Sequence, residues 1–291
     1  MTYKLNKIIL GTAQFGMNYG IANKKGKIKI REIFKILNFL KKKKINILDT
    51  ANSYKSSESE IGRYFFKTKK KFKIITKYSF KNSNSLSKQF KKTFSSLGYL
   101  PNTIIAHSYE DYLNPLFHKE IKIIKNKYYI KKLGVSIYNV DELNKVLDYK
   151  KPDVIQVPIN IFDKRFFDKK IIKILKKKSI KIIGRSVFLQ GLLFKDKEYI
   201  LRNFKNIKKE YFQLLKIARS EKVSLSQLSL IWVFNLKELD NIVIGVDSLD
   251  HLKENLGTLK KKISKKSLLQ IQKINLNNNK IIIPYLWKIK Q

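Results

Sequence analysis

Short apolar runs rich in β-branched residues recur along the chain, separated by longer lysine-rich segments. Each run is apolar at consecutive positions, which is typical of a strand that is buried on both faces. The pattern predicts eight such strands, at KIIL (7–10), INIL (45–48), KIIT (73–76), TIIA (103–106), KLGVSI (132–137), VIQVPI (154–159), IKIIG (180–184) and NIVIG (241–245).

The segments between these runs carry apolar residues at the spacing of amphipathic helices. Ile30, Ile33, Phe34 and Leu37 follow the i, i+3, i+4, i+7 rule. Two further stripes follow a similar spacing, Leu86–Phe90–Phe94–Leu97 and Leu249–Leu252–Leu256–Leu259. The long interval between the seventh and eighth strands holds two predicted helices, over residues 206–221 and 225–236. A last amphipathic stretch, residues 264–274, is predicted to form a C-terminal helix outside the main fold.

Strand followed by helix, repeated eight times without a Pro- or Gly-rich linker, predicts an α/β fold: a closed parallel (β/α)₈ TIM barrel spanning residues 1–291 as a single domain. The alternative is a doubly wound open sheet. Such a sheet usually carries a G-x-G-x-x-G phosphate-binding turn after its first strand. The corresponding stretch here, GTAQFG (11–16), lacks that spacing, so the barrel is favoured.

Composition narrows the possible chemistry. The chain has no cysteine and only three histidines, so disulfides and thiolate chemistry are excluded and no metal site is expected. No apolar run approaches the ~20 residues of a membrane span and no signal-peptide core is found, so a cytoplasmic protein without membrane contact is expected. The formal charge of +41 raises the possibility of a polyanion-binding protein. The lysines are spread through every segment, however, and no nucleic-acid-binding motif accompanies them, so no specific nucleic-acid partner is expected.

Titratable side chains follow neighbouring predicted strands. Asp49 ends the second strand, Tyr54 lies in the loop after it, Lys77 ends the third and His107 follows the fourth. In a (β/α)₈ barrel the carboxyl ends of the strands meet at the face that carries the active site. Taken singly, each has an ordinary explanation as a loop cap, a surface residue or a buried polar group; together they form a candidate catalytic group.

This group predicts a proton-donating tyrosine. A phenol has an ordinary pKa near ~10, and a buried ammonium beside it favours the phenolate and lowers that pKa. A carboxylate partner would keep the buried ammonium charged. Asp49, Lys77 and Tyr54 fit these three parts, and His107 is expected to orient a substrate oxygen or share the proton transfer. Further polar residues, Ser136, Gln156, Asn160, Arg185 and Ser186, end the fifth, sixth and seventh strands.

At this point the chain resembles the aldo-keto reductases, in particular a bacterial branch of that family. The resemblance runs through nearly the whole length in the family's order, in ILGTAQFG (9–16), DTANSY (49–54), SESEIG (57–62), IITKYS (74–79), IIAHS (104–108), LGVSIY (133–138), IQVPINIFD (155–163), GRSVFLQGLL (184–193) and IVIGVDSLDHLKENL (242–256). It implies a (β/α)₈ barrel that uses NADPH, or less often NADH, to reduce an aldehyde or ketone. Tyr54 is then the general acid, Lys77 lowers its pKa, Asp49 pairs with Lys77 and His107 orients the carbonyl.

The resemblance also implies a set of cofactor-binding positions: Gly11, Thr12, Ser136, Gln156, Arg185, Ser186, Gly245, Asp247, Ser248, His251, Glu254 and Asn255. Among these, Ser136 and Gln156 match positions that hold the nicotinamide carboxamide. Arg185 stands where many relatives have a stacking aromatic residue, and Ile137 where the family often has Asn. Gly245 and His251 replace a Lys and an Arg that many NADPH-preferring relatives place around the 2′-phosphate, so NADPH is favoured by the family resemblance and NADH stays possible.

The loops after the first, fourth and seventh strands are expected to shape the substrate pocket. They supply an apolar and aromatic wall that suits a sugar-like or aliphatic carbonyl compound: Phe15, Met17, Tyr19, Tyr109, Phe188 and Leu189. A small-molecule substrate and a monomer or weak oligomer are expected. The alternative from the same family is a cofactor-binding regulatory subunit with little turnover.

Overall fold

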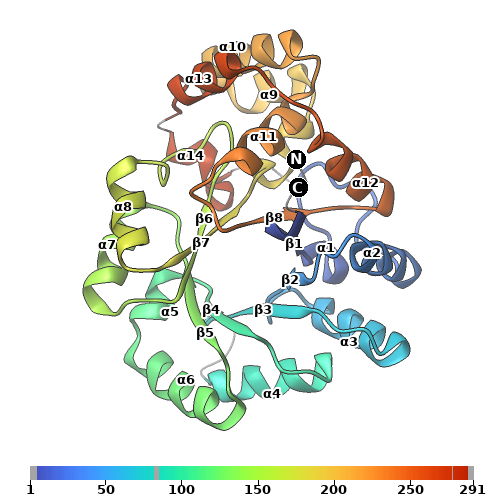
Figure 1. Ribbon diagram of the computed structural model, residues 1–291, viewed down its shortest axis with the longest axis vertical. Coiled ribbons are helices and arrows are strands. Elements are labelled where there is room, and N and C mark those ends of the chain that lie inside the picture. The colour runs from blue at the N-terminus through green and yellow to red at the C-terminus, as the bar shows by residue number, and fades with distance from the viewer. Residues whose placement is uncertain (1–4, 82–84, 277, 288–291) are drawn as a thin grey trace.

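Eight parallel strands form a closed barrel in the computed structural model, which describes residues 5–81, 85–276 and 278–287 (Figure 1). The strands are β1 (Ile8–Gly11), β2 (Ile47–Asp49), β3 (Lys73–Tyr78), β4 (Thr103–Ala106), β5 (Lys132–Ser136), β6 (Val154–Pro158), β7 (Lys181–Arg185) and β8 (Asn241–Gly245). They pair in chain order, and β8 closes the barrel against β1. The predicted barrel is therefore confirmed, and the open-sheet alternative is wrong because the last strand pairs with the first.

The strands are mostly apolar because both of their faces are covered. One set of side chains, Ile9, Ile75, Ile105, Val154 and Ile183, forms a separate buried cluster. Their neighbours along the strands, such as Ile8, Leu10 and Ile74, belong to the large core cluster shared with the helices. Successive strand residues point to opposite faces, so the first set fills the barrel interior and the second packs under the helical layer.

The helical layer surrounds the barrel. Its helices are α2 (Ile30–Lys42), α3 (Ser57–Thr68), α4 (Leu86–Leu97), α6 (Pro115–Tyr128), α7 (Val140–Tyr149), α8 (Lys169–Lys177), α11 (Leu225–Asn235) and α12 (Leu249–Thr258), with the shorter α1 (Ala13–Gly16) and α5 (Tyr109–Leu113). The apolar stripes predicted from the sequence mostly face inward. Phe94 is an exception, because its side chain is 45% exposed while Leu86, Phe90 and Leu97 of the same stripe are buried.

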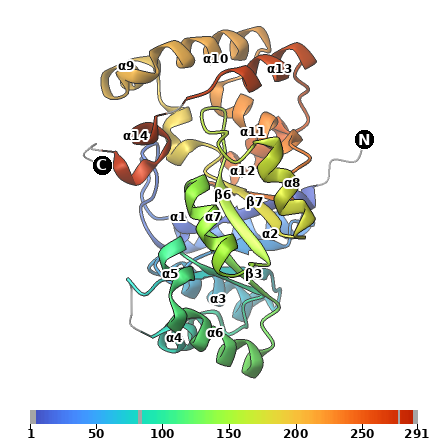
Figure 2. The same ribbon diagram turned by 90° about the vertical axis from the view of Figure 1, so that its left-hand side faces the viewer.

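The interval between β7 and β8 forms a group of helices at one end of the molecule. It contains α9 (Lys197–Asn203), α10 (Lys208–Ser220) and α11, with short 3₁₀ segments at Leu189–Phe194 and Lys205–Ile207. The C-terminal helix α13 (Lys265–Lys273) packs against α10 outside the barrel, as predicted, and α9, α10 and α13 lie together in both views (Figure 2). The chain then adds α14 (Asn279–Ile282) and a 3₁₀ turn at Pro284–Leu286.

The strand register places the polar residues at one rim. Gly11 pairs with both Asp49 and Gly245, Ser136 pairs with Gln156, and Pro158 pairs with Arg185. All of these residues except Gln156, which is the central residue of β6, lie at the carboxyl ends of their strands. Since parallel strands put their carboxyl ends on the same side of a barrel, these side chains surround one opening.

Candidate active site

A cavity of about 340 Å³ opens at this rim. All four predicted catalytic residues line it, together with most of the predicted cofactor-binding residues: Asp49, Tyr54, Lys77, His107, Gly11, Thr12, Ser136, Gln156, Arg185, Ser186, Gly245, Asp247 and His251. Three predicted cofactor-binding residues, Ser248, Glu254 and Asn255, do not line it. The barrel has thus brought together residues separated by more than two hundred positions in the sequence.

Asp49 and Lys77 form a buried ion pair at the floor of the cavity. Their side chains are only 5% and 3% exposed, and Lys77 Nζ donates to Asp49 Oδ1. Lys77 Nζ also lies 3.2 Å from the carbonyl oxygen of Thr50, while Asp49 Oδ2 accepts a hydrogen bond from Gln156 Nε2. A buried charge is tolerated when it is paired and its remaining hydrogen bonds are satisfied. The predicted pairing of Asp49 with Lys77 is therefore confirmed.

Tyr54 lies in the loop after β2, close to both Lys77 and His107. The loop is tightly turned, because the Tyr54 amide donates to Ala51 O (3.0 Å) and Tyr54 O accepts from the Ser57 amide (2.9 Å). The β1 loop packs so closely here that a Cβ on Gly16 would lie 1.8 Å from Tyr54 O. The Tyr54 ring lies 5.4 Å from Lys77 Nζ and 6.3 Å from the His107 ring, measured to ring centroids.

The electrostatic setting keeps Tyr54 and His107 uncharged. Burial raises the pKa of the Tyr54 phenol and the nearby Asp49 carboxylate raises it further, while Arg185 opposes the shift. This direction is opposite to the lowered pKa expected from the sequence, because burial of the phenol has the largest effect on its pKa. Burial lowers the pKa of His107 to about 3, and Lys77 and Arg185 contribute to that shift. At neutral pH the cavity therefore presents a phenol that can donate a proton and a neutral imidazole.

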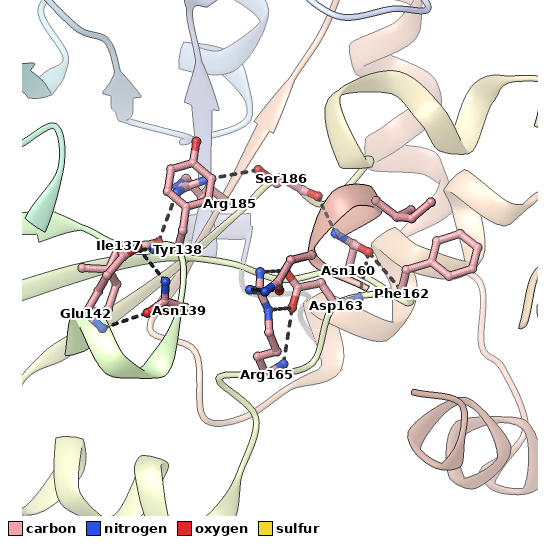
Figure 3. Close-up of polar contacts among 12 residues, drawn as sticks. Ile137, Tyr138, Asn139, Glu142, Asn160, Phe162, Asp163, Arg165, Arg185 and Ser186 are labelled. Atoms are coloured by element: carbon pink, nitrogen blue, oxygen red, sulfur yellow. Dashed lines mark hydrogen bonds and ion pairs between the residues drawn. The ribbon is translucent and has the colours of Figure 1, made fainter. Parts of the chain in front are cut away.

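Arg185 lies across the cavity floor at the end of β7. Its guanidinium donates from Nε to Ser136 Oγ (3.2 Å), from Nη1 to Ser186 Oγ (3.3 Å) and from Nη2 to Ile137 O (3.1 Å). The Tyr138 ring covers it at 4.2 Å from the guanidinium carbon (Figure 3). Ile137, which stands where the family often has Asn, is buried and contributes only its backbone oxygen. Asn160 supports this arrangement from behind, since its Nδ2 donates to Ser186 O (3.2 Å).

The rim near α12 is acidic. Ser248 Oγ caps the helix by accepting from the His251 amide, and Glu32 Oε1 accepts from the Leu249 amide at 2.7 Å. Asp247 lines the cavity beside Gln14, whose Nε2 lies 3.4 Å from Asp247 Oδ1. A helix N-terminus attracts anions through its free amides and its dipole. In this helix, the Glu32 carboxylate and the Ser248 hydroxyl already accept hydrogen bonds from two of these amides.

Three polar atoms on predicted cofactor-binding residues are buried without a hydrogen-bond partner. They are Gln156 Oε1, His251 Nε2 and Asn255 Nδ2, and they make up most of the five such atoms among the described residues. Glu254, by contrast, is exposed and accepts from Gln227 Nε2 at 3.4 Å. An unpaired buried polar group is costly, about 1–3 kcal/mol, unless a ligand or water completes it. Gln156 Oε1, an acceptor beside β5, fits the amide NH₂ of a nicotinamide. Asn255 Nδ2, a donor on α12, fits a ring nitrogen of an adenine.

The predicted substrate wall is correct only in part. Tyr19 and Phe188 line the cavity, whereas Phe15 and Leu189 are fully buried in the core, and Met17 and Tyr109 lie outside the lining. Sequence reasoning missed Tyr138, Asn23, Gln190 and Phe194, which do line it. The last three belong to the loops after β1 and β7, which dock on each other through the Ile21 amide and Gln190 O (3.0 Å). No periodic signal marks such loops, but Tyr138 directly follows a predicted strand end.

Among the described residues, no group of three or more His, Cys, Asp or Glu side chains could hold a metal ion. Within the same residues, no helix has the length and apolar character required to cross a membrane.

Comparisons with known proteins agree with this architecture. A model of the aldo/keto reductase family matches residues 7–276. A search of curated protein sequences gave no match. Three solved structures share the fold: an aldo-keto reductase from Klebsiella pneumoniae in complex with NADPH (15% identity, 94% of this chain and 92% of that chain, TM-score 0.70), the glycerol dehydrogenase AKR11B4 from Gluconobacter oxydans (18%, 96% and 92%, 0.69) and AKR11C1 from Bacillus halodurans in a holo form (16%, 92% and 91%, 0.69).

Proposed function

Because this chain belongs to the aldo/keto reductase family, we propose that it is an NAD(P)H-dependent oxidoreductase that reduces an aldehyde or ketone to an alcohol, with Tyr54 as the proton donor. The observation that carries the proposal is the convergence of Asp49, Tyr54, Lys77 and His107 in one cavity. Each side chain alone has an ordinary explanation. A buried ion pair beside a neutral phenol and a neutral imidazole is an arrangement suited to moving a proton to a carbonyl oxygen.

The reduced nicotinamide, when bound, supplies the hydride that the carbonyl carbon accepts. Tyr54 gives its phenolic proton to the carbonyl oxygen, so that the product is a neutral alcohol. The neutral imidazole of His107 donates a hydrogen bond to that oxygen and fixes the carbonyl relative to Tyr54. The Lys77 ammonium, 5.4 Å from the Tyr54 ring centroid, stabilises the phenolate that remains, and Asp49 pairs with this ammonium and holds it in position.

Tyr54 suits the role of donor although its pKa is raised. An alkoxide forming on the substrate is far more basic than a phenolate, since even water has a pKa of about 15.7. A phenol with a raised pKa therefore stays protonated before the reaction and still transfers its proton downhill. In the direction of alcohol oxidation, the same raised pKa would make Tyr54 a base that is rarely free at neutral pH. The arrangement favours reduction.

The cofactor would be held mainly by the residues whose polar atoms lack partners, with the amide at Gln156 beside Ser136 and the adenine near His251 and Asn255. NADPH is the cofactor favoured by the family. The carboxylates of Glu32 and Asp247 near the start of α12 are unfavourable for a 2′-phosphate, so we expect NADH to bind as well, within about tenfold of NADPH. Separate fluorescence titrations with the two reduced cofactors test this; a difference above a hundredfold would contradict it.

The cavity suits a sugar-like carbonyl compound. Tyr19, Asn23 and Gln190 supply hydroxyl and amide groups, while Phe188 and Phe194 supply apolar surface. Such a mixture of polar and aromatic groups is typical of sites that bind polyhydroxylated molecules. A glycerol dehydrogenase among the structural relatives supports the same substrate class.

Steady-state reduction of a panel of aldehydes by wild type and Tyr54→Phe tests the function. We expect kcat to fall by at least about a hundredfold, because general acid catalysis contributes ~10²–10⁴, while the Kd for NADPH stays the same. Tyr64→Phe is a matched control, since Tyr64 lies on α3 and its hydroxyl donates only to Asn38 Oδ1. Equal turnover by wild type and Tyr54→Phe would refute the proton-donor role. Tight cofactor binding by wild type with no turnover of any carbonyl would favour a regulatory subunit instead.

A further inference from the structure

Arg185 holds a full positive charge on the cavity floor and forms no ion pair with a carboxylate of residues 5–81, 85–276 or 278–287. Its three hydrogen bonds go to two serine hydroxyls and one backbone carbonyl, all uncharged (Figure 3). No ion pair is found for Arg185 among the described residues, whereas nearby Arg165 donates twice to the carboxylate of Asp163, at 2.9 and 2.8 Å. Because a guanidinium stays protonated at any physiological pH, the charge at Arg185 is permanent, and among the described residues no carboxylate is in direct contact with it.

The carboxylate of Glu142 interacts electrostatically with Arg185, but its oxygens are already engaged in other hydrogen bonds. Glu142 accepts from the Tyr138 amide at 2.6 Å and from Asn139 Nδ2 at 2.8 Å (Figure 3). Both contacts turn its oxygens toward the start of α7. Tyr138 itself stacks on the guanidinium through its ring, at 4.2 Å. The network therefore orients Arg185 rigidly and leaves its charge facing the cavity that it lines.

Arg185 borders the place where a carboxamide would bind. Gln156 Oε1 is a buried acceptor without a donor, and Ser136 is its register partner on the neighbouring strand. The amide NH₂ of a nicotinamide supplies the missing donor. Arg185 Nε donates to the oxygen of the same Ser136, so the ring that bears this amide would lie beside the guanidinium.

We propose that Arg185 makes the site discriminate between the two redox states of the cofactor, binding the reduced form more tightly than the oxidised form. The inference rests on the function proposed above. A dihydronicotinamide ring is uncharged, whereas the oxidised ring is a pyridinium cation. Like charges a few ångströms apart in a partly buried site repel strongly, and in the described part of the chain no carboxylate is paired with Arg185 to offset that repulsion.

The consequence for the enzyme is a bias in release. The oxidised cofactor dissociates readily after each turnover, while the reduced cofactor stays bound. A tenfold difference in the two dissociation constants corresponds to about 30 mV in the potential of the bound two-electron couple. The bound reduced cofactor is a weaker hydride donor by that amount. Arg185 would therefore favour release of the oxidised cofactor while lowering the driving force for hydride transfer.

The test is a pair of titrations with NADPH and NADP⁺ on wild type, Arg185→Gln and Arg185→Lys. We expect wild type to bind NADP⁺ at least about tenfold more weakly than NADPH, a difference of about 1.4 kcal/mol. Arg185→Gln should lower this ratio by about tenfold, chiefly through tighter binding of NADP⁺, and Arg185→Lys should keep most of it. Because the ratio is taken within each variant, a general loss of affinity cancels. Arg202→Gln, exposed on α9, removes the same charge far from the cavity and should leave the ratio unchanged.

The outcomes separate this inference from the proposed function. Equal affinities for the two redox forms in wild type, or an unchanged ratio in Arg185→Gln, would overturn the role of Arg185 and leave the reductase function standing. Failure of wild type to bind either form would overturn both. If Arg185→Gln does not fold, Arg185→Met gives the same loss of charge with a different side chain, and the wild-type ratio alone still decides whether the bias exists.

Discussion

The two halves of the cavity differ in how completely their polar groups are satisfied. On the β2–β3 side, both oxygens of Asp49 accept hydrogen bonds and Lys77 Nζ has two acceptors, so protein groups hold the charged pair in place without any ligand. On the side of β5 to β8, Gln156 Oε1 and His251 Nε2 have no partner, and neither has Asn255 Nδ2 on the adjoining α12. Arg185 on the same side forms no ion pair with any residue that the structure describes.

This difference indicates that the two sides of the cavity have different tasks, proton transfer and cofactor recognition. Groups that must be in place when a proton moves are fixed beforehand, because reorganising them during the reaction would add to the barrier. Groups that recognise a cofactor have polar atoms without hydrogen-bond partners in the free protein, so the cofactor supplies these partners and gains affinity. Gln156 joins the two halves, since its amide nitrogen donates to Asp49 while its oxygen stays open.

The largest effect is expected from substituting Lys77, on the β2–β3 side of the cavity. Lys77→Met leaves the Asp49 carboxylate buried without its cation, which typically costs about 3–5 kcal/mol in stability. We also expect kcat for carbonyl reduction to fall by more than about a hundredfold. Urea unfolding and steady-state kinetics measure the two effects.

The double variant Asp49→Asn, Lys77→Met sharpens this result. Removing both charges should restore much of the lost stability, because no unpaired charge remains, but it should not restore activity. A single variant as stable as wild type would show that the ion pair is not what holds this half together.

A smaller effect, confined to acid pH, is expected at His107. Its pKa is lowered to about 3 in the folded protein, against about 6.5 when unfolded. Between these values the unfolded chain binds more protons, so the contribution to stability is fully present above pH 6.5 and is lost as the pH falls toward 3, by at most about 1.4 kcal/mol per pH unit. His107→Asn should therefore lose less stability than wild type between pH 6.5 and 4 in urea unfolding. Parallel pH profiles of the two proteins would contradict the assigned direction.

The smallest effect is expected on the side of β5 to β8, from substituting Asn255 on the adjoining α12. Asn255→Leu removes a buried donor that has no partner in the free protein, so the stability of the free protein should stay the same or rise. Cofactor affinity should fall by about tenfold, because the ligand loses a hydrogen bond and leaves its own acceptor unpaired. Calorimetric titration and thermal unfolding of the free protein measure both. Gln213→Leu on α10, remote from the cavity and exposed, is the control for the loss of an amide.

Much of the fold was predictable because its signal is local. All eight strands begin and end within about two residues of the apolar runs, and helices α10, α11 and α13 lie within two residues of their predicted bounds. A strand that is covered on both faces must be apolar at successive positions, and a helix on a barrel must be apolar on one side. The exposed Phe94 shows the limit of this signal, because spacing marks a possible inner face without showing how far the neighbouring elements extend over it.

The sequence by itself determined the barrel, the order of its strands and the polar residues at the strand ends, including the pair Asp49 and Lys77 on adjacent strands. Only the tertiary structure decided how these residues are paired and charged. The bond from Gln156 to Asp49 joins strands that are not neighbours in the barrel, and the raised pKa of Tyr54 depends on burial by several loops. The lack of an ion pair at Arg185 within the described part of the chain has the same origin. Pairing and burial depend on distances across the closed barrel, which no local pattern of residues encodes.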